Sequence, residues 1–87
     1  MSKQIWKYEI NIGETKRDIP SNATILSVGL QGNNICAWAL VDTEERTSER
    51  TFCVYGTGWD IEESVEYLSC IGTVQDNSGF VWHVFEV

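Results

Sequence analysis

The sequence predicts one mainly β domain spanning residues 1–87, a small antiparallel sandwich or partly open barrel of about six strands. Apolar and polar residues alternate with period two along most of the chain, which is typical of half-buried strands. Residues that favour tight turns separate these stretches at 31–34 and 76–79. The chain has 87 residues, 43% of them hydrophobic, which suffices for one core but not for two.

The first strand is expected over residues 4–12, where apolar and charged side chains alternate as in a strand with one wet face. Trp6 belongs to the apolar set, and we expect it in the core. Residues 16–19 are polar and end at Pro20. Because proline has no N–H for a strand ladder, this piece is predicted to be an edge or a loop.

A hairpin is expected next. Residues 23–30 are β-branched and apolar, and the turn residues at 31–34 connect them to a return strand over 35–41. That return strand is apolar on both faces. Such a strand is central in its sheet, or its second face meets a partner.

The polar segment 42–49 predicts a loop, and alternation resumes in a strand over residues 50–57. The segment 60–68 leaves two structures open. Asp60 is suited to cap a short helix, because apolar residues follow it at helical spacing, but a loop fits equally well. We expect at most one short helical turn there.

The chain ends in a second predicted hairpin, with strands over residues 68–75 and 80–87. The last strand is again apolar on both faces, with Trp82 on one side and His83 on the other. Two such strands in a domain this small favour association of subunits, which would bury more surface. We therefore expect a homo-oligomer whose interface involves Trp82, His83 or Trp38.

The net charge of the chain limits the kinds of partner that it can bind. Thirteen acidic residues against six basic ones give a net charge of −7, the wrong sign for nonspecific nucleic-acid binding. The acidity fits solubility, attraction to a basic protein surface, or imitation of nucleic-acid charge. No stretch approaches the roughly 20 apolar residues of a membrane span, so we expect no membrane partner.

Metal, cofactor and catalytic motifs are not evident. The three cysteines are spaced too widely for a typical zinc site, and their odd number and the lack of a signal peptide favour a reducing cytosol. His83 is the only histidine, and nothing in the sequence marks a nucleophile beside it. We predict no metal, no cofactor and no enzymatic activity.

A ligand-binding surface can be suggested from the aromatic residues. Trp59 lies in a glycine-flanked loop rather than in an alternating strand. An exposed ring beside Arg46 or Arg50 would stack a base while the guanidinium meets a phosphate. Trp38 and His83, each on a strand with two apolar faces, complete the predicted ligand-binding set.

Four motifs carry a family resemblance: IWKYEI (residues 5–10), ILSVGLQGNNICAWALVD (25–42), GTGWDI (56–61) and IGTVQDNSGFVWHVFE (71–86). Together they resemble a family of short bacteriophage proteins of unknown function, over nearly the whole chain. The resemblance implies a product made in the cytoplasm of an infected bacterium, of the kind that counters host antiviral defence.

Two mechanisms suit that context. One is a sponge, an oligomer that sequesters a nucleotide immune signal at its subunit interface, and this is the function we expect first. The other is an acidic inhibitor that binds a host defence protein directly, for example as a nucleic-acid mimic. An accessory structural role in the phage is a third possibility.

Overall fold

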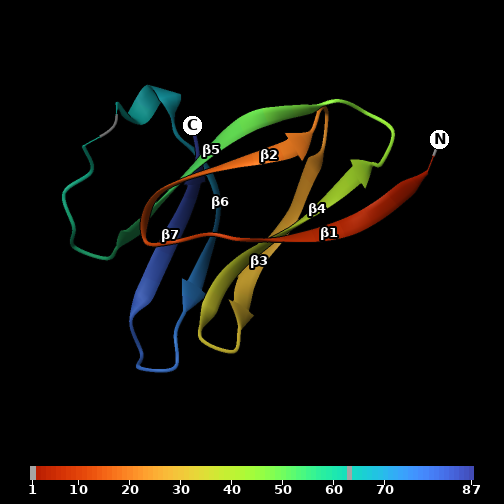
Figure 1. Cartoon of the computed structure of the whole chain (residues 1–87). Helices are drawn as coiled ribbons and strands as arrows, with labels where there is room; N and C mark the ends of the chain where they lie inside the picture. Colours follow the sequence, from red (N-terminus) through yellow and green to blue (C-terminus); the bar gives the residue numbers. More distant parts are fainter. Residues whose placement is uncertain (1, 63) are drawn as a thin grey trace.

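The alternating sequence folds into two antiparallel sheets, which the computed structural model describes for residues 2–62 and 64–87 (Figure 1). One sheet has three strands in the order β1-β4-β3, and the other has four in the order β2-β5-β7-β6. The prediction of a mainly β, sandwich-like domain is confirmed, with seven strands instead of about six. Their bounds are β1 Lys3–Glu9, β2 Gly13–Pro20, β3 Thr24–Gln31, β4 Asn34–Asp42, β5 Thr47–Gly56, β6 Ser69–Gln75 and β7 Val81–Glu86.

The additional strand is β2, which includes the segment predicted to be an edge or a loop. It pairs with β5 over its whole length, and Pro20 takes the last position opposite Thr47. The edge alternative is confirmed, because β2 is an edge strand of its sheet. The strand begins earlier than expected, at Gly13, because Thr15, although polar, is buried. As an edge strand, β2 tolerates a proline at its end.

The core lies between the sheets. β4 directs its small and branched side chains inward, and β5 and β7 face them with Phe52, Val54 and Val84, which are fully buried. β4 and β7 are central in their sheets, as their two apolar faces predicted. The outward side chains of β7 include His83 and Phe85, both half-buried, and Phe85 packs edge-to-face on Tyr55 with ring centroids 6.0 Å apart.

The tryptophans separate into different environments. Trp82 belongs to the core and is 9% exposed, so it is not available as the centre of an outer interface. Trp38 is half-buried on the outer face of β4. The core position expected for Trp6 is wrong: it is 37% exposed, because β1 is an edge strand that the four-stranded sheet does not cover.

A loop and one short helical turn were left open for residues 60–68, and the described part of this segment contains such a turn, the 3₁₀ helix η1 (Val65–Tyr67). Its start lies five residues beyond Asp60, so the capping role predicted for Asp60 is wrong. Before this turn, the chain leaves β5 through a glycine-rich reversal at residues 56–58. That reversal places Trp59 at the end of the four-stranded sheet.

Besides the core, contacts at three places among the described residues connect the two sheets. Arg50 on β5 forms a two-pronged ion pair with Glu86 on β7 and donates through Nη1 to the Ala23 carbonyl, 2.6 Å away, beside the other sheet. β3 and β6 lie close where Gly72 meets Val28. The tips of the β3–β4 and β6–β7 hairpins are joined by hydrogen bonds from Asn77, and Figure 1 shows them side by side.

Candidate functional site

A cleft of about 530 Å³ opens beside Trp82, where the end of β5 lies against the start of β7. This volume is within the range of small-ligand sites. The wall is mostly apolar and aromatic. Its lining residues are Gly56, Thr57, Trp59, Gly79, Phe80, Val81 and Trp82.

Three aromatic rings meet at this cleft. Trp59 meets Trp82 edge-to-face, with centroids 5.2 Å apart and an angle of 89° between the rings, and Phe80 lies 6.3 Å from Trp82. Trp82 is buried, whereas Trp59 is 51% and Phe80 65% exposed. Two large exposed rings anchored on a buried one form a surface suited to recognition, since aromatic side chains dominate binding hot spots.

The local sequence explains the position of Trp59. Its indole lies against Gly56, where an added Cβ would stand 2.8 Å from Nε1. Only glycine leaves room for the ring at that point. The backbone N–H of Trp59 donates to the Gly56 carbonyl at 3.1 Å, and Gly58 has a φ of +88°, so the reversal is tight.

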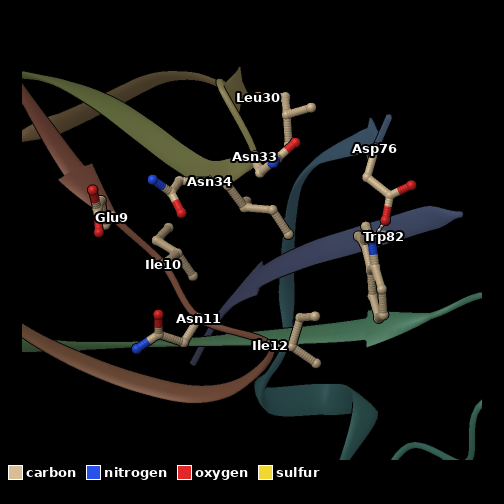
Figure 2. Close-up of a pocket in the computed structure, with 10 residues that line it drawn as sticks. Glu9, Ile10, Asn11, Ile12, Leu30, Asn33, Asn34, Asp76 and Trp82 are labelled. Carbon is tan, nitrogen blue, oxygen red and sulfur yellow. Dashed lines mark hydrogen bonds between the residues drawn. The ribbon is translucent and has the colours of Figure 1, made fainter. Parts of the chain in front are cut away.

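Asp76 fixes the opposite wall. Its Oδ1 accepts hydrogen bonds from the backbone N–H groups of Ser78 (2.8 Å) and Phe80 (3.0 Å). Its Oδ2 accepts one from the indole Nε1 of Trp82 at 3.0 Å, drawn as a dashed line in Figure 2. The bond from Trp82, with those from the backbone, lowers the pKa of Asp76. One carboxylate thus orients both Phe80 and Trp82.

Trp82 also lines a smaller, polar pocket of about 170 Å³ (Figure 2). The segment that leaves β1 and the tip of the β3–β4 hairpin supply most of its wall, including two carboxylates and three amides: Glu9, Asp76, Asn11, Asn33 and Asn34. Within the described ranges, no group of three metal-ligating side chains is placed to hold a metal ion. This pocket offers hydrogen-bonding groups without positive charge.

A further cleft of about 270 Å³ lies across Trp59 and reaches the outer face of β7. His83 lines it, and its Nε2 is 2.7 Å from Oγ1 of Thr57. Tyr55, Phe85 and Ile61 supply apolar walls. Trp59 therefore stands between two openings and can be reached from both.

A match over the whole sequence assigns the chain to a family. Residues 1–87 match the model of a family described as Domain of unknown function (DUF7352). The chain belongs to this family. No curated protein and no solved structure matches the chain. In this DUF7352 domain, no helix within residues 2–62 and 64–87 is long and apolar enough to cross a membrane.

The DUF7352 fold brings together only part of the predicted ligand-binding set. Trp59 and His83 line the same opening. Arg50 is paired with Glu86 on the neighbouring strand of its own sheet, and Trp38 lies on the other sheet. Arg46 precedes β5 and Trp59 follows it, so the ten residues of that strand keep them about 33 Å apart. The expected pairing of Trp59 with an arginine is therefore not formed.

Phe80 and Asp76 were missed by sequence reasoning, and Trp82 was assigned to an interface. These residues join Trp59 only because β5 pairs with β7, which sets Gly56 opposite Trp82. The sequence offered only a local signal for these residues: Asp76 begins the hairpin turn, and the aromatic Phe80 follows the glycine that ends it. That signal predicts the turn but not the cleft.

Charge is distributed unevenly along the DUF7352 chain. All six Lys and Arg residues occur by position 50, whereas residues 51–87 contain six carboxylates and neither Lys nor Arg. The aromatic cleft is built entirely from residues 56–82. Asp60, directly after Trp59, and Glu62 are exposed. The cleft therefore lies in the acidic part of the chain.

Proposed function

We propose that this domain is a non-catalytic binding protein whose aromatic cleft receives an arginine or lysine side chain of a basic partner protein. The observation that carries the proposal is the pair of exposed rings, Trp59 and Phe80, in a part of the chain that has carboxylates but neither Lys nor Arg. A guanidinium or ammonium over such a ring gains about 0.5–2 kcal/mol.

The charge of the domain supports the same partner. A net charge of −7 attracts a basic surface from a distance and raises the association rate at low salt. Asp60 and Glu62, which are exposed in the segment after Trp59, add carboxylates to the same part of the chain. In the phage context suggested by the sequence resemblance, the partner is a host defence protein in the bacterial cytoplasm, which the domain inhibits by occupying its basic surface.

Sequestration of a nucleotide signal is the competing proposal. The exposed face of Trp59 favours it, because a base stacks on an indole. The surroundings oppose it, since no Lys or Arg lines the cleft to pair with the phosphates. Arg50, the residue expected to bind a phosphate, is already paired with Glu86.

A titration distinguishes binding of a basic side chain from sequestration of a nucleotide. It is followed by NMR through the indole N–H signals of the tryptophans. The first probe is a capped glycine pentapeptide with one central arginine, and its control replaces arginine by the uncharged isostere citrulline. We expect the signals of Trp59 and Trp82 to move, and citrulline to bind about 2- to 30-fold more weakly. Equal binding of both peptides would contradict a cation site.

ATP and a cyclic dinucleotide form the second arm of the titration. Tighter binding of either nucleotide than of the arginine peptide would overturn the proposal in favour of sequestration. Trp59→Ala should remove the response to the arginine peptide, while Trp6→Ala, which truncates an exposed indole on the other sheet, should leave it unchanged.

A further inference from the structure

The outer edge of β1 is open. β1 pairs only with β4 among the described strands, in a continuous register without a bulge. Ser2 and Ile10, which flank the strand, both bond to the β4 side. Because backbone direction alternates along an antiparallel strand, even-numbered residues of β1 face β4, and Lys3, Ile5, Lys7 and Glu9 direct their N–H and C=O groups to the open edge.

Apart from the Glu9 carbonyl, this edge combines backbone groups that have no neighbouring strand with apolar side chains. Ile5 is 61% exposed, Trp6 37%, and Leu40, next to Ile5 across the strand pair, 37%. An edge of this kind is a template for a further strand. At its far end, Arg17 donates through Nε to the Glu9 carbonyl at 3.1 Å, so the edge accepts a donor where one is within reach.

We propose that β1 pairs antiparallel with β1 of a second copy of this chain, with Trp6 opposite the partner's Trp6. Backbone direction allows only registers in which odd-numbered residues meet odd-numbered ones. In the proposed register Lys3 lies opposite the partner's Glu9, and Ile5 lies opposite the partner's Lys7. Opposite charges directly across a strand pair are stabilising.

The neighbouring registers are unfavourable. A shift in one direction sets Lys7 opposite the partner's Lys7. A shift in the other sets Lys3 opposite the partner's Lys7. Like charges directly opposite destabilise a strand pair, so the sequence of β1 selects the register centred on Trp6. The strand is complementary to itself, as a twofold symmetric interface requires.

The dimer would join two three-stranded sheets into one of six strands, in the order β3-β4-β1-β1-β4-β3. The aromatic cleft belongs to the four-stranded sheet, so both copies keep it open. The pairing would also stabilise the domain. A chain of this size has a small core, and a second copy buries more apolar surface. This interface is independent of what the cleft binds.

Sedimentation over a range of concentrations tests the pairing through a charge exchange. The unmodified chain should dimerise reversibly. Lys3→Glu and Glu9→Lys each set like charges opposite at two symmetric positions, and each should raise the dimer Kd about 5- to 30-fold. The double variant should return the Kd to within about threefold of the original. A monomer at all concentrations, or a double variant as weak as the single ones, would overturn the proposal.

Ile5→Pro removes a backbone N–H that faces the open edge and leaves the β1–β4 ladder intact. It should abolish the dimer without changing the thermal unfolding of the monomer. Leu26→Asp alters an exposed apolar residue on β3 and should leave the dimer unchanged. Loss of the dimer in Leu26→Asp but not in Ile5→Pro would assign the interface to another surface.

Discussion

At the scale of single residues, Asp76 holds one wall of the cleft through its hydrogen bonds with Phe80 and Trp82. Hydrogen bonds from Trp82 and the turn backbone lower its pKa in the folded protein, so the folded state favours the charged form. The stabilisation is fully present above the unfolded pKa of about 3.9 and is lost as the pH falls through the lower folded pKa. The turn that holds Phe80 should therefore loosen in acid.

We expect the fluorescence of Trp82 to change reversibly below about pH 4, before the whole domain unfolds. Asp76→Asn removes the titrating carboxylate, so the variant should show a disturbed Trp82 signal already at neutral pH and no local acid transition. If the variant and the original chain give the same acid titration, Asp76 does not control this wall.

Gly56 controls the other wall. Gly56→Ala should push the indole of Trp59 away, because the new Cβ would lie 2.8 Å from Nε1. Binding of the arginine peptide should fall as far as in Trp59→Ala, while the fold is kept, since the indole is half-exposed and can rotate. Near-ultraviolet circular dichroism and the peptide titration would measure both effects.

Gly29→Ala is the matched control on the other sheet. There an added Cβ meets Trp38 at 3.5 Å, an ordinary contact. It should leave peptide binding unchanged. Equal loss of binding in both variants would mean that the effect of Gly56→Ala comes from general destabilisation and not from the position of Trp59.

At the scale of elements, the close approach of β6 to β3 depends on Gly72. An added Cβ would lie 2.6 Å from Cγ2 of Val28, so Gly72→Ala should destabilise the domain by about 1–3 kcal/mol through overpacking. Val28→Ala removes the clashing methyl group. In urea unfolding, the double variant should lose less free energy than the sum of the single losses; strict additivity would show that the two residues do not compete for space.

The elements also show how far sequence reasoning reaches. Both hairpins were predicted because their signals are local: alternation on either side of turn residues. For residues 16–19 of β2 an edge and a loop were left open, and the edge is confirmed. The start of β2 at Gly13 was not predicted, because Thr15 is polar yet buried. Trp59 was singled out as exposed because it lies in a glycine-flanked loop. Phe80 and Trp82 were not assigned to the same site, because they join Trp59 only through the pairing of β5 with β7.

At the scale of the whole molecule, Arg50 connects the two sheets: it pairs with Glu86 on the neighbouring strand β7 and donates to the Ala23 carbonyl beside the three-stranded sheet. Both side chains are 21% exposed, and the hydrogen bond to Glu86 raises the pKa of Arg50. Glu86→Ala should destabilise the domain by about 1.5–3 kcal/mol, because it leaves a half-buried guanidinium without its carboxylate. Replacing both residues, as in Arg50→Met with Glu86→Leu, should cost less in chemical unfolding; an equal or greater loss would contradict this account.

The uneven placement of basic residues has a practical consequence. The three lysines lie on β1 and β2, so acylation with an amine-reactive reagent modifies the open edge and leaves the aromatic cleft chemically untouched. Mild acylation should weaken self-association, because it neutralises Lys3, which lies opposite the partner's Glu9, while the arginine peptide binds as before. A dye attached in this way would report on the cleft of a monomer. Trypsin cuts after Lys and Arg, so it would leave all the cleft-lining residues together in one peptide that begins at residue 51.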